Sequence, residues 1–170
     1  MTKREIERKF LVASLPAGLL DDHQGENINQ GYLILEDQTE LRIRSRAGRC
    51  TMTLKQGSGL DRQEQEQEID SELFAMLWPL TVGKRVEKTR YVIDQSGYGL
   101  ELDLFRGALE PLILLEIEFA TVAGSHDFVP PDFVVREVTR DRAFSNAMLA
   151  IAGLPGDIGQ DSGRKSDEEK

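Results

Sequence analysis

Between residues 5 and 119, hydrophobic and polar residues alternate in short runs that are separated by turn-forming residues. In the run Glu40–Arg46, for example, Leu41 and Ile43 fall on one face and Arg42 and Arg44 on the other. A period of two is typical of a β-strand with one buried face. Turn-forming pairs such as Ala47-Gly48 join neighbouring runs, which indicates antiparallel pairing. The pattern therefore predicts an α+β, mainly β fold with an antiparallel sheet that curls or closes.

Seven or eight strands are expected. The segments that fit the pattern are Glu5–Val12, Gln30–Leu35, Glu40–Arg46, Cys50–Lys55, Arg62–Ile69, Val86–Ile93, Leu100–Phe105 and Leu112–Phe119. The segment Arg62–Ile69 is polar on both faces, so we expect Glu64 and Glu66 to order it by meeting basic residues of the neighbouring strands.

Two segments repeat apolar residues at helical spacing instead. The first runs from Asp70 or Ser71 to Trp78, with a buried stripe of Leu73, Phe74, Leu77 and Trp78. The second begins at Thr139 or Asp141 and ends near Ile151, with Phe144, Met148 and Ile151 on one face. Residues 121–135 are expected to be irregular. Residues 153–170 are rich in Gly, Asp, Glu and Lys and are predicted to be a disordered tail, which leaves residues 1–152 as one domain.

The polar faces of the predicted strands carry rows of like charge. Acidic rows contain Glu64 and Glu66, Glu101 and Asp103, and Glu116 and Glu118, while basic rows contain Arg42 and Arg44, Lys55, and Lys88 and Arg90. The first strand places Glu5, Glu7 and Lys9 on one face, and taken alone it is better explained as a solvated edge strand. The recurrence changes that interpretation, because rows of like charge repel one another if they are merely exposed.

A closed barrel with a charged lumen would let acidic and basic rows face each other across water, with the apolar faces outward beneath the helices. Such a lumen suits a compact, multiply charged anion. Triphosphate fits, with cationic side chains on its oxygens and carboxylates holding Mg²⁺ or Mn²⁺. The cationic side chains in question are Arg42, Arg44, Lys55, Lys88 and Arg90.

Composition narrows the function classes. The 170 residues are 39% hydrophobic and 30% charged, without a run of apolar residues long enough to span a membrane. The net charge of −9 argues against a nucleic-acid polymer as partner, so the expected partner is a small anionic substrate. A single cysteine, Cys50, and the lack of an apolar signal region predict a cytoplasmic location. The sequence leaves the oligomeric state open, a homodimer included.

The motifs, taken as a set, resemble one family. Glu5-x-Glu7-x-Lys9 within EIERKFLV is similar to the opening strand of the CYTH superfamily, or triphosphate tunnel metalloenzymes. Further similar segments follow in order: QGYL around Tyr32, Arg42-x-Arg44, Lys55, Arg62-x-Glu64-x-Glu66, Lys88-Thr89-Arg90-Tyr91, Glu101-x-Asp103, Glu116-x-Glu118-Phe119 and Glu137-Val138-Thr139. The resemblance covers about residues 3–151 and is closest to short bacterial inorganic tripolyphosphatases. It implies a closed tunnel of eight antiparallel strands, a few flanking helices, and metal-dependent hydrolysis of inorganic tripolyphosphate to pyrophosphate and phosphate.

The resemblance also implies roles for individual residues. Glu5, Glu7, Glu116 and Glu118 would be metal ligands, and Lys9 would bind phosphate together with Arg42, Arg44, Lys55, Lys88 and Arg90. Glu64 and Glu66 would position the attacking water or a second metal. Lys9 and Tyr32 match a lysine–tyrosine pair of some bacterial members, in which a neighbouring ammonium would favour tyrosinate as a general base. The roles of Glu68, Glu101 and Asp103 are left unassigned.

Other functions on the same scaffold stay open at this stage. One alternative is an adenylate cyclase or an organic triphosphatase for thiamine or nucleoside triphosphates. Another is a non-catalytic module that binds polyphosphate, although the retained acidic rows disfavour simple anion binding.

Overall fold

The computed structural model describes residues 6–57, 63–156 and 158 of the chain, and these form a single nine-stranded antiparallel sheet. The strand order across the sheet is β5-β4-β3-β2-β6-β7-β8-β1-β9. The strands are β1 (Ile6–Val12), β2 (Glu26–Glu36), β3 (Thr39–Arg46), β4 (Arg49–Gln56), β5 (Gln63–Ile69), β6 (Arg85–Gln95), β7 (Tyr98–Phe105), β8 (Ile113–Phe119) and β9 (Val134–Glu137). The alternating runs of the sequence account for all of them except β9.

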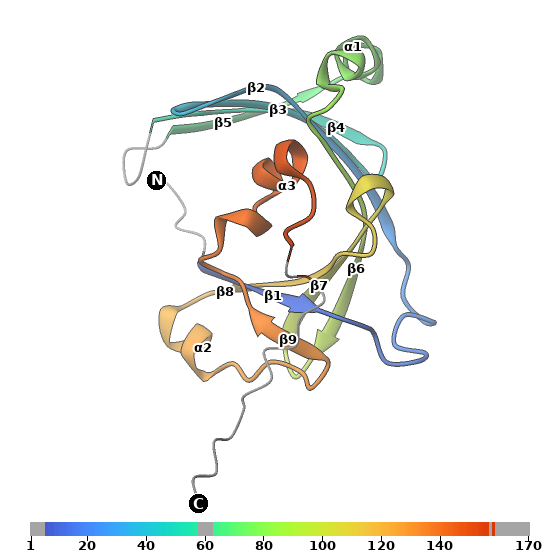
Figure 1. Cartoon of the computed structure of the whole chain (residues 1–170), viewed down its shortest axis with the longest axis vertical. Helices are drawn as coiled ribbons and strands as arrows, with labels where there is room; N and C mark the ends of the chain where they lie inside the picture. The colour runs from blue at the N-terminus through green and yellow to red at the C-terminus, as the bar shows by residue number, and fades with distance from the viewer. Residues whose placement is uncertain (1–5, 58–62, 157, 159–170) are drawn as a thin grey trace, which may run out of the picture.

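The predicted mainly β, antiparallel fold with a few flanking helices is confirmed, and the sheet is strongly curled. Among the described residues it has nine strands where eight were expected, and it is not closed. Within the described residues β5 pairs only with β4, and β9 pairs only with β1. The short strand β9 occupies the edge of β1 that an eight-stranded barrel would need for closure. Figure 1 shows β2–β5 on one side of the curl and β1, β7 and β8 on the other, with the helix α3 in the hollow between them.

Helices flank the sheet on its outside and also enter its hollow. On the outer face lie α1 (Ser71–Leu77), followed by the 3-10 helix η2 (Trp78–Thr81), and α2 (Val122–Asp127). The helix α1 begins at the predicted cap Asp70, whose side chain accepts from the Leu73 backbone N–H at 2.7 Å. None of its residues is fully buried, so the predicted stripe is only half-covered. The short 3-10 turn η3 (Gly107–Leu109) connects β7 to β8.

The region after β8 differs most from the prediction. The segment expected to be irregular contains α2 and β9, and the expected final helix is two elements, η4 (Arg142–Phe144) and α3 (Asn146–Ala152). Ser145 breaks the helix with an extended backbone and caps α3 by accepting from the Met148 N–H. The break rotates α3, so that Leu149 is buried beside Phe144 whereas Ile151 is exposed.

One apolar cluster, the outer cluster, lies on the convex face of β1, β6, β7 and β8. Its buried members are Phe10, Val12, Ile93, Leu100, Leu102, Leu115, Ile117, Phe119 and Phe128. Phe128, which follows α2, packs against Phe10 and Phe119 with ring centroids 6.1 and 5.6 Å apart. This cluster confirms the expectation that the apolar faces of these strands point away from the charged rows.

A second apolar cluster, the inner cluster, fills one end of the concave face. It contains Leu11, Val86, Phe105, Leu109, Leu112, Leu114, Val138, Phe144 and Leu149. Side chains two positions apart share a face of a strand, so Leu11, Val86 and Leu114 continue the rows of Lys9, Lys88 and Glu116. The concave face therefore changes from charged to apolar along each of these strands, and α3 packs where the change occurs. Leu154 and Ile158 also pack against this cluster, and residues 157 and 159–170 of the predicted tail lie outside the described residues.

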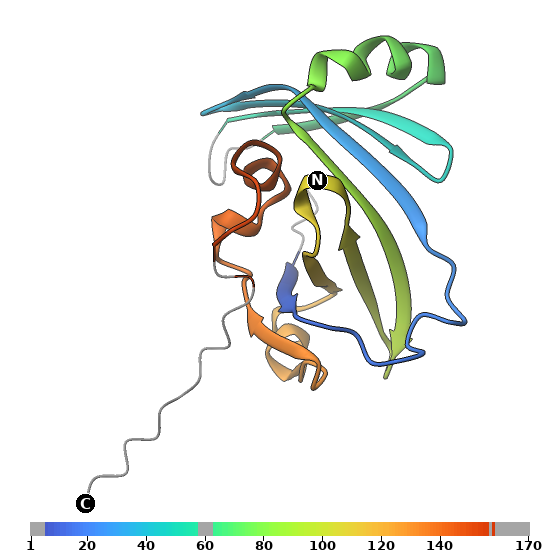
Figure 2. The same cartoon turned by 45° about the vertical axis from the view of Figure 1, so that its right-hand side comes forward.

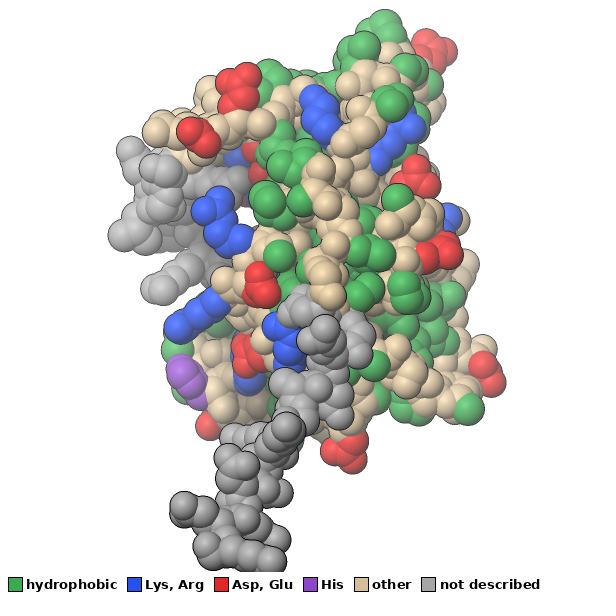
Figure 3. All heavy atoms as spheres, viewed as in Figure 1, with side chains coloured by type: hydrophobic (Ala, Val, Ile, Leu, Met, Phe, Trp, Pro, Cys, Tyr) green, Lys and Arg blue, Asp and Glu red, His purple; other side chains and the backbone are tan. Residues whose placement is uncertain are grey.

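The outer surface carries no concentration of one charge on the face seen in Figure 3, where acidic and basic side chains are interspersed with hydrophobic ones. The helices within the described ranges are all too short and polar to cross a membrane.

Candidate active site

The predicted rows of charge converge on one cavity of about 420 Å³ on the concave face of the sheet. Residues from eight strands, β1 to β8, and from α3 line it. They are Glu7, Ile28, Gln30, Arg42, Arg44, Arg46, Lys55, Glu64, Glu66, Lys88, Arg90, Glu101, Glu116, Ile117, Glu118 and Asn146. The period of two places them there, because each strand turns every second side chain toward the hollow. The strands of the curl thus bring together acids and bases that are far apart in the sequence.

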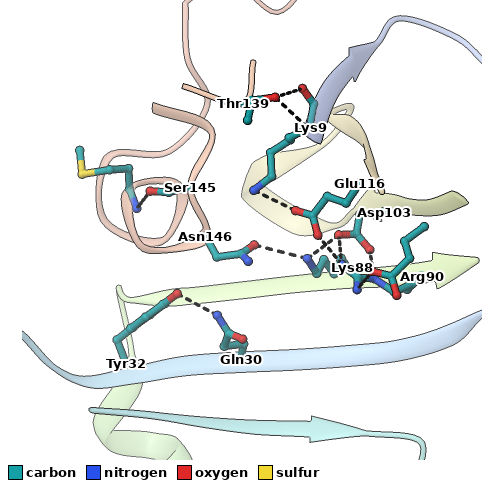
Figure 4. Close-up of polar contacts among 12 residues, drawn as sticks. Lys9, Gln30, Tyr32, Lys88, Arg90, Asp103, Glu116, Thr139, Ser145 and Asn146 are labelled. Carbon is teal, nitrogen blue, oxygen red and sulfur yellow. Dashed lines mark hydrogen bonds and ion pairs between the residues drawn. The ribbon is translucent and has the colours of Figure 1, made fainter. Parts of the chain in front are cut away.

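Lys88 and Arg90 on β6 are held by carboxylates. Asp103 on β7, which is fully buried, accepts from Lys88 Nζ at 2.5 Å and from Arg90 Nε and Nη2 at 2.6 Å each (Figure 4). Arg90 also donates to Glu101 and, at 2.9 Å, to Glu116. Burial by itself would lower the pKa of Arg90, but the hydrogen bonds and charges of these acids raise it above its ordinary value. The positive charges of Lys88 and Arg90 are therefore already compensated by protein groups.

Arg42 and Arg44 on β3 are in the opposite situation. Burial and the neighbouring charge of Arg42 lower the pKa of Arg44, and only Glu66, 3.5 Å away, compensates its charge. Arg42 lies 3.9 Å from Glu40, and its buried Nε has no hydrogen-bond partner among the described residues. A guanidinium that is partly buried and short of acceptors favours an incoming anion.

The edge strand β5 is held to β4 and β3 by ion pairs, as its polar sequence predicts. Lys55 Nζ lies 3.1 Å from Glu64, and Glu66 accepts from Thr53 Oγ1 at 3.0 Å as well as facing Arg44. Glu68 instead pairs with the exposed Arg49 at 2.8 Å and does not line the cavity. Of the acids on β5, Glu64 and Glu66 face the cavity.

Lys9 and Tyr32, the predicted pair, have separate partners in this structure. Lys9 Nζ lies 2.9 Å from Glu116, whereas Tyr32 Oη accepts from Gln30 Nε2 at 2.8 Å (Figure 4). Burial, aided by the charge of Glu40, raises the pKa of Tyr32 to about 12, although Arg42 and Gln30 oppose the shift. This direction is opposite to the one expected from a neighbouring ammonium, so Tyr32 is a protonated hydroxyl here.

A bulge in β2 sets the position of Tyr32. The pairing of β2 with β3 shifts between Tyr32 and Ile34, and the Tyr32 N–H bonds to the carbonyl of Lys84 at 3.0 Å. Lys84 Nζ in turn donates to the carbonyl of Leu33 at 3.0 Å. Gly31 lets Thr81 of η2 pack closely against β2, because a Cβ on Gly31 would lie 2.5 Å from Thr81 Oγ1.

Carboxylates of β1 and β8 form the acidic side of the cavity. Glu7 lies directly opposite Glu118, and Lys9 lies opposite Glu116. Although burial opposes ionisation, Lys88, Lys9 and Arg90 lower the pKa of Glu116 to about 2, so this residue is a carboxylate at neutral pH. No cluster of three or more acidic, histidine or cysteine side chains close enough for a metal is present among the described residues. Glu5, the remaining predicted ligand, lies outside them.

Like charges directly opposite on neighbouring strands repel, and a divalent cation between them would relieve the repulsion. The oxygen donors of Glu7 and Glu118 are those that Mg²⁺ and Mn²⁺ prefer. The donor set of this edge of the cavity therefore fits such an ion.

Three cavity residues were missed by the sequence analysis. Arg46 continues the row of Arg42 and Arg44 at the same spacing, so its position could have been inferred; it pairs with Glu26 at 2.7 Å. Gln30 shares the face of Tyr32 but carries no charge. Asn146 could not have been found from strand patterns, because it enters the cavity from α3.

Comparisons with known proteins agree with this geometry. The family model described as the CYTH domain matches residues 3–131. An inorganic triphosphatase of Nitrosomonas europaea is 47% identical over 150 residues, which cover 87% of this chain and 97% of that protein. An inorganic triphosphatase of Acetivibrio thermocellus is 33% identical over 153 residues, covering 86% of this chain and 92% of that protein. A crystal structure of an inorganic triphosphatase matches with a TM-score of 0.74 and 44% identity, over 90% of this chain and 97% of that chain.

Proposed function

This chain belongs to the CYTH domain family, and from that premise we propose that it is an inorganic triphosphatase whose active site is the charged cavity of the curled sheet. It is a hydrolase that acts on a small triphosphate substrate. The inorganic triphosphatases of Nitrosomonas europaea and Acetivibrio thermocellus match this chain over 97% and 92% of their own lengths, and this similarity supports the activity.

The observation that carries the proposal is the imbalance among the cationic side chains. Arg42 and Arg44 are partly buried and poorly compensated, whereas Lys88 and Arg90 are saturated by acids. A triphosphate would supply an oxygen acceptor for the unpaired Nε of Arg42 and further acceptors for Arg44 and Lys55, which each face one glutamate. Several cations converging on one chain of phosphoryl groups neutralise the charge that shifts during phosphoryl transfer.

Triphosphatases of this family depend on metal ions, and we propose Mg²⁺ or Mn²⁺ for this protein. Glu7, Glu116 and Glu118 would hold the ion, with Glu5 as a further ligand. A bound ion would supply positive charge that helps to neutralise the triphosphate. Metal binding would explain why a site for an anion contains so many carboxylates, since an anion alone would bind more strongly without them.

The remaining predicted site residues would orient the reactants, and of these Lys9 and Tyr32 lie beside the cavity without lining it. Lys9 binds a phosphate oxygen from its place beside Glu116, while Lys88 and Arg90 contribute to the positive potential and keep Asp103 and Glu116 in position. Glu64 and Glu66 face the cavity on the side of Arg44 and are placed to position the attacking water or a second metal. Tyr32 acts as a hydrogen-bond donor in its protonated form, and a role as base requires loss of the proton that its burial retains. Such positioning provides most of the rate enhancement in phosphoryl transfer.

The proposal includes a cytoplasmic location. The single, buried cysteine Cys50 supports it, because one cysteine cannot form a disulfide within the chain and the fold therefore does not depend on an oxidising compartment.

The substrate is tested by measuring phosphate release with Mg²⁺ and with Mn²⁺. Inorganic tripolyphosphate is expected to be hydrolysed at least about tenfold faster than ATP, because no described residue that lines the cavity is aromatic and could stack on a base. Equal or faster turnover of ATP would contradict the proposal, and formation of cyclic AMP would identify a cyclase. Tight binding of tripolyphosphate without turnover under any divalent ion would identify a binding module.

The metal site is tested with Glu118→Gln, which removes a charge and keeps the shape of the side chain. We expect the Mg²⁺ concentration for half-maximal activity to rise about 10- to 100-fold, because an amide is a weaker ligand for a hard cation. Activity measured over a titration of Mg²⁺ gives this value. Glu68→Gln is the matched control, since Glu68 lies outside the cavity, and an unchanged titration curve for Glu118→Gln would remove Glu118 from the ligand set.

A further inference from the structure

Asn146 is the first residue of α3 and lies outside residues 3–131, which the family model matches. It is nevertheless one of the residues that line the charged cavity. Figure 4 shows its side chain pointing toward Lys88, between Tyr32 and Gln30 on one side and Lys9 and Glu116 on the other. The C-terminal part of the chain thus supplies a polar side chain to a site otherwise built by the sheet.

The side chain of Asn146 has one hydrogen-bond partner among the described residues. Its Oδ1 accepts from Lys88 Nζ at 3.4 Å, and Lys88 is itself anchored by Asp103. The Nδ2 group makes no hydrogen bond with any other described residue. An amide nitrogen carries two donor hydrogens, so Asn146 presents unused donors within a cavity suited to an anion.

The backbone of Asn146 is held firmly. Ser145 caps α3, and Leu149 packs in the inner cluster against side chains of the sheet. Because the inner cluster is apolar, it offers no hydrogen-bond donors or positive charges to a phosphate. Asn146 therefore lies where the polar part of the hollow ends.

We propose that Asn146 is a substrate-binding residue that donates from Nδ2 to a phosphoryl oxygen at the inner end of the cavity. The inference rests on the proposed triphosphatase function. A neutral donor suits this position, since an additional cation there would compete with Lys88 for Asp103. The contact helps to hold the triphosphate in register with the metal-binding acids on β1 and β8.

Two substitutions separate this role from a structural one. Asn146→Ala removes donor and acceptor without adding a charge, whereas Asn146→Asp keeps an acceptor for Lys88, removes the donors and adds a negative charge. We expect both variants to raise the KM for tripolyphosphate about tenfold or more with a smaller change in kcat, and to weaken tripolyphosphate binding measured by calorimetry without a divalent ion. Because Asp103 still anchors Lys88 in Asn146→Ala, a role of Asn146 as an acceptor alone would leave binding and turnover of tripolyphosphate unchanged in this variant, which would overturn the proposal.

Ile151→Ala is the matched control, because Ile151 lies on the exposed side of the same helix. It is expected to leave KM and binding unchanged, and thermal unfolding of all three variants checks that α3 stays in place. If the unmodified protein does not hydrolyse tripolyphosphate, the proposed function fails. If it does and Asn146→Ala matches it in KM and in binding, only the role of Asn146 fails.

Discussion

Replacing Arg44 with alanine is expected to lower kcat/KM for tripolyphosphate by about 10²- to 10³-fold. The structural reason is that the guanidinium of Arg44 lies in the cavity, beside Arg42, with Glu66 as its compensating acid. The same substitution is expected to leave the free energy of unfolding unchanged or to raise it. Burial and the charge of Arg42 both act against the charged form of Arg44 in the free protein, so its removal relieves an unfavourable interaction.

Arg49→Ala is the control, because Arg49 is the first residue of the next strand, β4, and its side chain is 73% exposed and paired with Glu68. Steady-state kinetics and chemical denaturation of both variants give the two quantities. Arg44→Ala that keeps full activity would contradict a role in substrate binding. A strong loss of stability in Arg44→Ala would show that Arg44 is a structural residue, like Arg90.

The contrast between Arg44 and Arg90 defines what the sequence could predict. Both belong to pairs spaced two residues apart on strands, and this spacing correctly placed both in the cavity. The sequence does not reveal which acids lie beside them. Asp103 and Glu101 reach Arg90 because β7 pairs with β6 in a particular register, whereas the neighbours of β3 present Thr51, Thr53 and Gln30. The pairs Arg42-x-Arg44 and Lys88-x-Arg90 have the same spacing, but the neighbouring strands place acids beside the second pair and mainly uncharged side chains beside the first.

The elements that the sequence analysis missed depend on contacts between distant segments. The strand β9 has four residues, which is too few to show alternation, and it is held by pairing with β1 and by the ion pair of Glu137 with Arg8 at 2.7 Å. The break before α3 depends on Ser145, whose preference for capping is visible, but the burial of Leu149 in place of Ile151 follows from the curl of the sheet. Closure could not be decided from the strand pattern, because open and closed sheets share the same period of two.

The buried network around Asp103 is expected to dominate the stability of this part of the sheet. Asp103→Asn keeps the size of the side chain but removes its charge and turns an amide donor toward Lys88 and Arg90. Removal of one partner from a buried ion pair costs about 3–5 kcal/mol, since the other charge stays buried without compensation. Arg90 retains Glu101 and Glu116, so most of the cost falls on Lys88, whose side chain is 5% exposed.

Urea denaturation of Asp103→Asn should therefore show a large fall in the free energy of unfolding. Glu68→Gln, in an exposed ion pair with Arg49, should leave the denaturation midpoint unchanged. Equal stability of the two variants would mean that Lys88 finds water or another acid when Asp103 is neutralised. The expected result, combined with an unchanged stability of Arg44→Ala, would distinguish two groups of basic residues. Lys88 and Arg90 would stabilise the sheet, whereas Arg42 and Arg44 would serve to bind the substrate. This division of roles would explain how one cavity can contain so many basic residues. The acids of β7 and β8 would stabilise Lys88 and Arg90, and a bound substrate would stabilise Arg42 and Arg44.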